Sequence, residues 1–331
     1  MIVVKFGGSS LAGPERMLAA ARIVATHTER EPVVCVVSAM AGVTNQLLAL
    51  AEQAMEGAAD WRASSADIRR AHDETLAALT LSAACHQAAT LTPLWDALET
   101  DAGALATLGK GRARDEAVAA FSAWGERLSV RLFAAALDRV GLNPSCFEDA
   151  PVIVERSAAS VSATRAWLCE PITHLLRCGQ APVLPGYLAM TQDGQYTTLG
   201  RNGSDHSAAV IAAALGAHAV YLYSDVAGIY ESDPRLTPQA RLLTTLSYDE
   251  AAAIAVRGAR VLHPATIPPL AERGIPLRLR SALAPDAPGT DIGPGCTRPM
   301  PPRPPQPPAF ALLACLAAST SAGKAVRPDA F

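Results

Sequence analysis

A short polar stretch from Thr197 to Asp205 combines residue types that could bind an anion. Its last six residues contain two glycines, an arginine, an asparagine, a serine and an aspartate, and an alanine-rich helical segment follows at once. Because a helix N-terminus carries unpaired N–H groups and a positive partial charge, this position favours a negatively charged ligand. The same residues also suit a plain Ser or Asp N-cap behind a glycine turn. The stretch alone leaves both interpretations open.

A lysine near the N-terminus is a second candidate for chemistry. Only three of the 28 basic residues are lysines, and one of them, Lys5, lies in an apolar run of strand length. A compact ammonium and a planar guanidinium are not interchangeable, so a lysine in this arginine-rich chain suggests a chemical role. The amides of Gly7 and Gly8, which follow, could hold phosphate oxygens. The alternative is a lysine that extends from a strand end into solvent.

The elements that would position these residues alternate between strand and helix. Strand patterns cover 2–6, 33–38 and 219–223, and helical patterns begin near residues 14, 44 and 205. This alternation predicts an α/β fold, a three-layer αβα sandwich with a mainly parallel open sheet. Such sheets bind ligands at the carboxyl ends of their strands, where Lys5 and the segment Ser224–Tyr230 are expected.

Other segments have local signals of their own. Residues 61–139 show only helical patterning, which predicts a helical insertion. Strands are predicted at 152–154 and 182–188, a hairpin turn at 193–194 and an edge strand at 276–280. The spacing of Ser247 and Glu250 predicts a capping box, and Pro171 should disturb a helix predicted over 162–177.

Composition narrows the class of protein. A chain of 331 residues with 50% hydrophobic and 18% charged residues can bury a large core, as one large domain or two ordinary ones. The net charge of -3 indicates no basic surface, so we expect no nucleic-acid partner. The seven cysteines lie at irregular distances without a C-x-x-C pair, which argues against a disulfide framework and a zinc site.

The two ends of the chain differ in character. The N-terminal residues enter a strand pattern without a cationic region or a long apolar stretch, so we expect no signal peptide and a cytoplasmic protein. Eight prolines lie between Pro294 and Pro308, which predicts a disordered tail over 294–331. The apolar run 309–318 is shorter than the about 20 residues that cross a bilayer, so we expect no membrane partner.

Six motifs resemble, in order, those of aspartate kinases in the amino-acid kinase superfamily. They are Lys5-Phe-Gly-Gly-Ser9, residues 37–45, residues 199–205, residues 224–230, Asp233-Pro-Arg235 and residues 258–264. With Asn202, the third motif is most similar to the kinase half of bifunctional aspartokinase/homoserine dehydrogenases. The resemblance covers residues 1 to about 293, and six motifs in the family's order make chance a poor explanation.

The resemblance implies the amino-acid kinase fold and an ATP- and Mg²⁺-dependent reaction. The family transfers the γ-phosphate of ATP to the side-chain carboxylate of L-aspartate, giving 4-phospho-L-aspartate on the way to lysine, threonine and methionine. The acceptor carboxylate, with a pKa near about 4, is ionised at neutral pH, so no general base is required. We therefore expect catalysis by positioning and charge neutralisation.

The resemblance also implies roles for individual residues. Lys5 would neutralise charge on the transferred phosphoryl group, and Asp205 would orient Lys5 near the magnesium ion. The nucleotide would contact Lys5, Gly7, Gly8, Ser9, Ser224, Asp225, Tyr230, Arg235 and Arg260. Aspartate would contact Thr44, Glu126, Arg201 and Ser204. The alternatives are purely structural roles: a helix cap for Asp205, a solvated helix face for Glu126 and an ordinary turn for Asp233. The residues that hold the metal stay open.

Three departures from the family pattern bear on function. Arg260 stands where the family usually has a lysine, and Ala227 replaces the second acid of an Asp-x-Asp-Gly turn. The proline-rich tail resembles neither a regulatory ACT domain nor a dehydrogenase, so we expect no feedback inhibition through such a domain. A catalytically weak nucleotide-binding pseudo-kinase or partner subunit, and a kinase of another acidic acceptor such as glutamate, remain alternatives. A homodimer is also compatible with the sequence.

Overall fold

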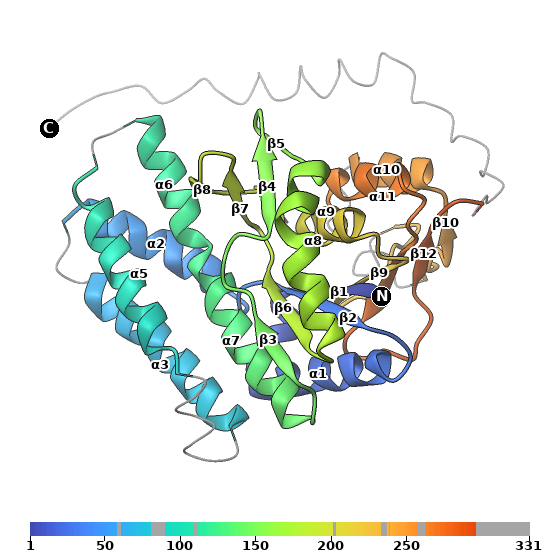
Figure 1. The fold of residues 1–331 in the computed structure, drawn as a ribbon, viewed down its shortest axis with the longest axis horizontal. Helices are drawn as coiled ribbons and strands as arrows, with labels where there is room; N and C mark the ends of the chain where they lie inside the picture. Colours follow the sequence, from blue (N-terminus) through green and yellow to red (C-terminus); the bar gives the residue numbers. More distant parts are fainter. Residues whose placement is uncertain are drawn as a thin grey trace, which may run out of the picture. The chain divides into compact units, whose positions relative to one another are not determined.

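The structure is a computed structural model that describes residues 1–57, 61–80, 90–108, 111–200, 203–232, 237, 239–256 and 262–295 (Figure 1). The predicted tail from residue 296 onward and the predicted site residues Arg201, Arg235 and Arg260 lie outside these ranges, as does Asp233. Within residues 1–295, helices flank a central sheet on both faces.

The central sheet has eight strands, in the order β10-β12-β11-β9-β1-β2-β6-β3. Their bounds are β1 Ile2–Phe6, β2 Val33–Val37, β3 Pro144–Cys146, β6 Ala181–Pro185, β9 Val220–Ser224, β10 Thr245–Leu246, β11 Leu277–Ser281 and β12 Thr290–Ile292. Every neighbouring pair is parallel except β11 and β12. The residues of β2 are all buried, as expected for an apolar strand that is covered on both faces. The predicted α/β fold with a mainly parallel sheet is confirmed.

Two hydrophobic cores lie on opposite faces of this sheet. The first contains side chains from α1 (Pro14–Thr28), α2 (Val43–Met55), α3 (Trp61–Leu79), α5 (Thr92–Leu105), α6 (Arg112–Ser122) and α7 (Trp124–Arg139). The second contains side chains from α8 (Val161–Arg177), α9 (Gly203–Leu215), α10 (Tyr248–Val256) and α11 (Ile267–Ala271). Ile2, Val4 and Phe6 join the first core and Val3 the second, because successive side chains of a strand point to opposite faces. Lys5 therefore shares the face of Val3, which α9 covers.

A second, smaller sheet lies beside the first. Its order is β5-β4-β7-β8, with β4 Val152–Glu155, β5 Ala158–Ala159, β7 Leu188–Thr191 and β8 Tyr196–Thr198. The hairpin turn predicted at 193–194 is confirmed, since β7 and β8 pair antiparallel across it and Gly194 has a φ of 85°. The single strand predicted over 182–188 is wrong. Gly186 and Tyr187, which has a φ of 63°, separate β6 of the large sheet from β7 of the small one.

Two further sequence predictions need correction. The segment predicted as an edge strand is β11, which lies inside the sheet between β9 and β12. Its alternation reflects one buried face, with Leu277 and Leu279, and one partly exposed face. Helix α8 runs through Pro171 without a break, because this proline lies on the exposed side of the helix, where water can replace the lost hydrogen bond.

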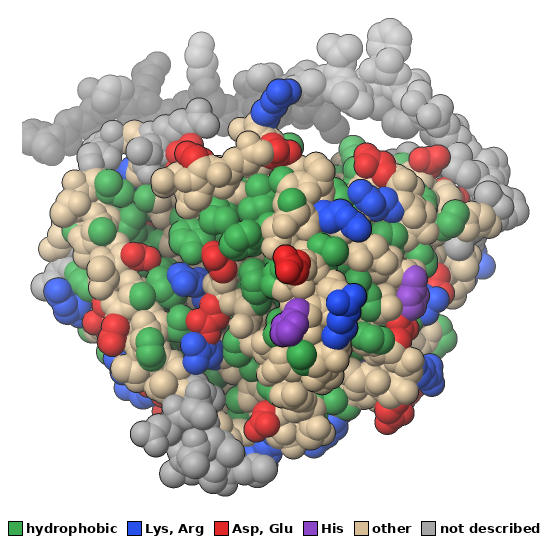
Figure 2. All heavy atoms as spheres, viewed as in Figure 1, with side chains coloured by type: hydrophobic (Ala, Val, Ile, Leu, Met, Phe, Trp, Pro, Cys, Tyr) green, Lys and Arg blue, Asp and Glu red, His purple; other side chains and the backbone are tan. Residues whose placement is uncertain are grey.

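The capping box at the start of α10 is confirmed. The Ser247 backbone N–H donates to the Glu250 carboxylate at 2.8 Å, and the Glu250 N–H donates to Ser247 Oγ at 3.2 Å. None of the helices in the described part has the length and hydrophobicity that a membrane crossing needs. On the face drawn in Figure 2, the described acidic and basic side chains are scattered among apolar ones.

Candidate active site

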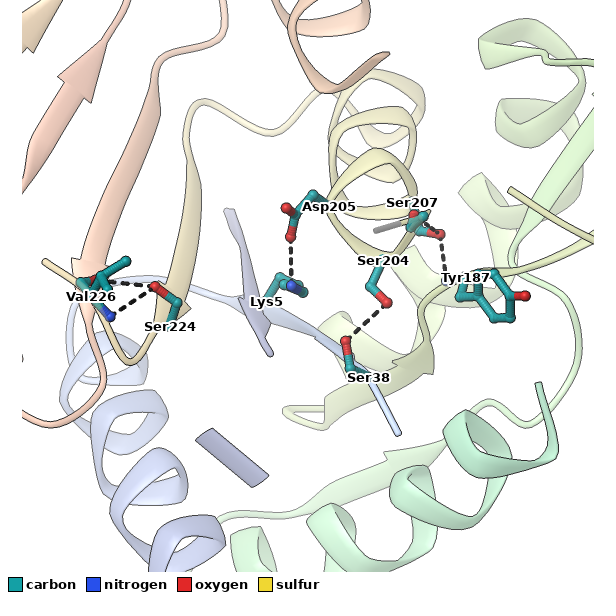
Figure 3. A network of polar contacts seen from close by, with 9 residues as sticks. Lys5, Ser38, Tyr187, Ser204, Asp205, Ser207, Ser224 and Val226 are labelled. Carbon is teal, nitrogen blue, oxygen red and sulfur yellow. Dashed lines mark hydrogen bonds and ion pairs between the residues drawn. The ribbon is translucent and has the colours of Figure 1, made fainter. Parts of the chain in front are cut away.

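Four predicted site residues among those that the structure describes, Lys5, Ser204, Asp205 and Ser224, lie at the carboxyl ends of the central strands (Figure 3). Because β1, β2 and β9 are parallel, their last residues reach the same edge of the sheet. Figure 3 shows Lys5, Ser38 and Ser224 at these strand ends, with Ser204 and Asp205 of α9 facing them. Residues that are up to 219 positions apart in sequence are thus gathered at one place, as the positions of Lys5 and Ser224 show.

Lys5 and Asp205 form the most buried ion pair of this region. Lys5 Nζ lies 2.5 Å from Asp205 Oδ1, and the two side chains are only 11% and 12% exposed. Asp205 belongs to the first turn of α9, where the helix N-terminus stabilises negative charge. The pair fixes the lysine ammonium at the sheet edge, where it can meet a negatively charged ligand.

The glycine turn after β1 is a short 3₁₀ helix, η1 (Gly8–Leu11). The Gly7 N–H donates to the Tyr223 carbonyl at 3.1 Å, so this amide is engaged in the sheet. The amides of Gly8 and Ser9 begin the helix and have no partner inside it, because a helix leaves its first N–H groups unpaired. A Cβ on Gly8 would lie 2.8 Å from the Ala39 carbonyl oxygen, so only glycine fits between these two loops.

A pair of serines joins β2 to α9. Ser38 follows β2 directly, and its Oγ donates to Ser204 Oγ at 2.9 Å (Figure 3). Ser204 is 7% exposed and packs so tightly on Gly186 that a Cβ there would lie 2.7 Å from Ser204 Cβ. The sequence predicted Ser204 as a substrate-binding residue, whereas Ser38, in the motif of residues 37–45, was assigned no binding role. The position of Ser38 at a strand end beside other site residues was the available signal.

Tyr187 is a further residue that the motifs did not indicate. Its backbone N–H donates to Ser207 Oγ at 2.9 Å, and its carbonyl accepts a hydrogen bond from the Leu199 N–H at 2.9 Å. Its hydroxyl lies 3.1 Å from Ser122 Oγ at the end of α6. These contacts hold a non-glycine residue at positive φ, which sequence patterns do not reveal.

Glu126 lies in the first turn of α7 and is 3% exposed. The alternative of a solvated helix face is therefore wrong. Burial raises the pKa of this carboxyl group to about 8, although a hydrogen bond from the Ala39 backbone and the charge of Lys5 lower it. Its Oε2 is buried without a hydrogen-bond partner among the described residues. A cationic group of a ligand would supply the missing partner.

The segment after β9 holds the predicted nucleotide residues. Ser224 Oγ donates to the Val226 carbonyl at 3.1 Å and accepts from the Val226 N–H at 3.3 Å, which closes the turn (Figure 3). Asp225 is exposed, and Tyr230 forms an isolated bridge with Leu242. Thr44, a predicted substrate-binding residue, lies in the first turn of α2.

The described residues contain no group of three His, Cys, Asp or Glu side chains that could hold a metal ion. Among the described residues, Asp205 is the carboxylate that pairs with Lys5, and Glu126 lies within reach of the charge of Lys5. Mg²⁺ is commonly bound through one or two carboxylates together with substrate phosphates. The donor set thus fits a magnesium ion that arrives with a nucleotide rather than one held by the protein alone.

This fold, with a buried lysine–carboxylate pair and a glycine turn at the carboxyl ends of a parallel sheet, defines an α/β phosphate-handling protein. Residues 1–281 match the family model described as the Amino acid kinase family. The match covers most of the sequence, and the chain belongs to the amino acid kinase family.

Curated relatives are similar over most of this chain but are longer. A bifunctional aspartokinase/homoserine dehydrogenase from Haemophilus influenzae is 33% identical over 302 residues, which cover 88% of this chain and 36% of the relative. Aspartokinase 1, chloroplastic, from Arabidopsis thaliana is 33% identical over 311 residues, which cover 88% of this chain and 51% of the relative. The chain therefore spans about a third to a half of the length of these two proteins.

A solved structure supports the same relationship. The crystal structure of E. coli aspartokinase III in complex with aspartate and ADP is 30% identical, with a TM-score of 0.79. The similarity covers 90% of this chain and 65% of that chain. The resemblance to aspartate kinases that the sequence motifs predict is confirmed.

Proposed function

We propose that this chain uses ATP to phosphorylate the side-chain carboxylate of L-aspartate. The observation that carries the proposal is the contact of Lys5 Nζ with Asp205 Oδ1, 2.5 Å apart at the carboxyl end of the sheet. Glu126, buried and within reach of the charge of Lys5, adds a place for an amino group. The similar proteins are named aspartokinases, and one was solved with aspartate and ADP.

The reaction joins two anions. A carboxylate oxygen of aspartate attacks the γ-phosphorus of ATP, the bond from that phosphorus to the β,γ-bridging oxygen breaks, and ADP leaves with this oxygen. The products are ADP and 4-phospho-L-aspartate. Since the carboxylate, with a pKa of about 3.9, is already ionised at neutral pH, no proton has to be removed. The protein contributes position and positive charge.

Lys5 supplies this charge beside the transferred phosphoryl group. Asp205 holds the ammonium in one place through their ion pair, so little rearrangement is needed when phosphate charge arrives. The amides of Gly8 and Ser9 donate hydrogen bonds to phosphate oxygens. Ser224, Asp225 and Tyr230 contact the nucleotide, together with Gly7, Arg235 and Arg260, the last two outside the described residues.

The acceptor occupies the space between α2, α7 and α9. Glu126 pairs with the α-ammonium group of aspartate, and Ser204 and Thr44 donate hydroxyl hydrogen bonds. Arg201, which lies outside the described residues, binds the α-carboxylate with its two-pronged guanidinium. A magnesium ion bound to the nucleotide, beside Asp205, would offset phosphate charge. The homodimer and the cytoplasmic location stay predictions.

The direct test is an assay with ATP, Mg²⁺, L-aspartate and hydroxylamine, which traps the acyl phosphate as aspartyl hydroxamate. We expect hydroxamate that depends on ATP and on the chain. No hydroxamate from well-folded protein would refute the proposal. Turnover with L-glutamate instead would identify a kinase of another acceptor, and nucleotide binding without turnover on any amino acid would identify a pseudo-kinase.

A further inference from the structure

An arginine next to Glu126 in sequence lies in an aromatic sandwich. The guanidinium carbon of Arg127 lies 4.0 Å from the ring centroid of Trp124 and 5.8 Å from that of Tyr196. Arg127 and Trp124 belong to the first turn of α7, and Tyr196 begins β8. A cation over the faces of two aromatic rings is attracted to both, more strongly where water is excluded.

Each ring of the sandwich is held by a carboxylate from another element. The Trp124 indole N–H donates to Asp101 Oδ2 of α5 at 3.0 Å. The Tyr196 hydroxyl donates to Asp149 Oδ1, in the segment between β3 and β4, at 2.9 Å. Neither carboxylate forms an ion pair with Arg127 among the described residues. The five side chains, which we call the Arg127 cluster, thus join four separate segments.

Among the residues that the structure describes, Arg127 has no side-chain hydrogen bond that would explain its position. Its Nε is buried and has no hydrogen-bond partner among the described residues. An arginine kept only for solubility would extend its guanidinium into water. Stacking between the two rings is therefore the interaction that fixes this side chain.

The cluster connects the two sides of the proposed acceptor site. Helix α7 carries Glu126, immediately before Arg127. Strand β8 ends at Thr198, and the Leu199 N–H then bonds to the Tyr187 carbonyl before the chain enters α9 with Ser204 and Asp205. Any shift of β8 relative to α7 would change the distance between Glu126 and the residues of α9.

We propose that Arg127 is a positioning residue for the acceptor site, which it sets by fixing the β7–β8 hairpin to α7 through Trp124 and Tyr196. The effect of Arg127 on aspartate binding rests on the proposed function. Its effect on the docking of the hairpin rests on the observed contacts alone. Arg127 touches no reacting atom. Its action is transmitted through Tyr196 to the loop that leads into α9.

The first experiment measures the hairpin and does not depend on catalysis. Hydrogen–deuterium exchange of the amides over residues 188–198 is compared between the unaltered chain, Arg127→Met and Tyr196→Ala. We expect about tenfold faster exchange in both variants, because the loss of a partly desolvated cation–π contact weakens the docking of β8 by about that factor. Arg139→Met, at the other end of α7, is the matched control and should exchange as the unaltered chain does. Unchanged exchange in Arg127→Met would overturn the inference.

The second experiment separates positioning from general stability. We expect the KM for L-aspartate to rise about tenfold in Arg127→Met while the KM for ATP stays within about twofold, because the nucleotide residues lie on other strands. Arg127→Lys should recover part of the loss, since an ammonium is also attracted to the faces of aromatic rings. Equal rises in both KM values with a lowered melting temperature would show a merely structural role and overturn the inference. If the unaltered chain does not turn over aspartate, the proposed function fails, and the exchange experiment still decides the role of Arg127.

Discussion

At the scale of single residues, the site depends on which face of a strand a side chain occupies. Lys5 lies on the face of β1 that α9 covers, opposite Val4 and Phe6, and there it meets Asp205. The scarcity of lysine in this chain suggested a chemical role for Lys5. The alternation of side chains along β1 then sets the face of the sheet to which Lys5 points. A shift of one position would turn the ammonium into the opposite core.

Replacement of Lys5 tests its assigned role. Lys5→Ala should lower the rate of hydroxamate formation by at least about 100-fold, because it removes a preorganised charge from the reacting phosphoryl group. The fold should survive, since Asp205 keeps the stabilising first turn of α9. The measurement is kcat in the trapping assay, with circular dichroism as the control for folding. Retained activity would contradict the role.

The buried carboxyl group of Glu126 should release a proton when the substrate binds. Its pKa of about 8 keeps the carboxyl group neutral at pH 7, whereas an aspartate ammonium beside it would favour the ionised form. Binding of L-aspartate at pH 7 should thus release about one proton, because the ligand moves the pKa from above the solution pH to below it. Calorimetry in two buffers of different ionisation enthalpy measures this number. Equal heats in both buffers would refute the prediction, and Glu126→Gln should abolish the release.

At the scale of elements, close backbone contacts set the distances between site loops. The turn η1 approaches the loop after β2 so closely that a Cβ on Gly8 would lie 2.8 Å from the Ala39 carbonyl oxygen. Helix α7 approaches the same loop through Gly125, where a Cβ would lie 2.7 Å from Ala39 Cβ. These glycines bring Lys5, Ser38 and Glu126 together, and bulkier residues would push their elements apart.

Two neighbouring glycines allow a matched comparison. Gly8→Ala should destabilise the chain by about 1–3 kcal/mol, because its Cβ would meet a backbone oxygen that cannot move away cheaply. In Gly7→Ala the Cβ would lie 3.6 Å from Lys5 Nζ, an ordinary contact, so its stability should change little. Urea unfolding of both variants checks this difference. Equal free energies of unfolding would show that the close approach does not constrain η1.

The packing of α3 on α5 predicts a dependence of stability on pH. His72 is fully buried, its Nδ1 donates to the Ile68 carbonyl, and its ring lies edge-on to Trp95 at 5.5 Å between centroids. Burial lowers the pKa of His72 below its usual 6.5, so the unfolded chain binds the proton first as the pH falls. The contribution of His72 to the free energy of unfolding should be fully present above pH 6.5. As the pH falls below 6.5, the free energy of unfolding should decrease through this group by at most about 1.4 kcal/mol per pH unit.

The measurement is urea unfolding between pH 7.5 and 5. His72→Gln should have a smaller loss of stability over this range than the unaltered chain. His218→Gln, at a largely exposed histidine, is the control, and its pH dependence should match that of the unaltered chain. A His72→Gln variant with an unchanged slope would assign the acid sensitivity to another group.

Local patterns predicted the elements better than their partners. The sequence predicted the buried runs at β1 and β2, the turn at Gly194 and the capping box at Ser247, because each of these features depends on residues close in sequence. The sequence did not predict the break between β6 and β7, since Tyr187 adopts positive φ only under constraint from distant Ser207 and Ser122. Likewise, the interior position of β11 depends on which strands pair with it. Tertiary contacts decide such features.

At the scale of the whole molecule, the kinase fold accounts for part of the length of the similar proteins. The chain covers 36% of the Haemophilus influenzae relative and 65% of the solved E. coli chain. We propose that residues 1–293 form the catalytic domain, with a helical insertion over about 61–139. The motifs in this range predicted the family, because they occur together and in the family's order.

The central position of β1 has a consequence for the order in which the molecule can form. Its partner strands are β2, about 30 residues away in sequence, and β9, more than 200 residues away. Lys5 and its ion-pair partner Asp205 are separated by a similar stretch of sequence. During synthesis from the N-terminus, one edge of β1 therefore stays unpaired until residue 224 has left the ribosome. The ion pair of Lys5 and Asp205 likewise cannot form before residue 205 has been made, so a shorter chain lacks it.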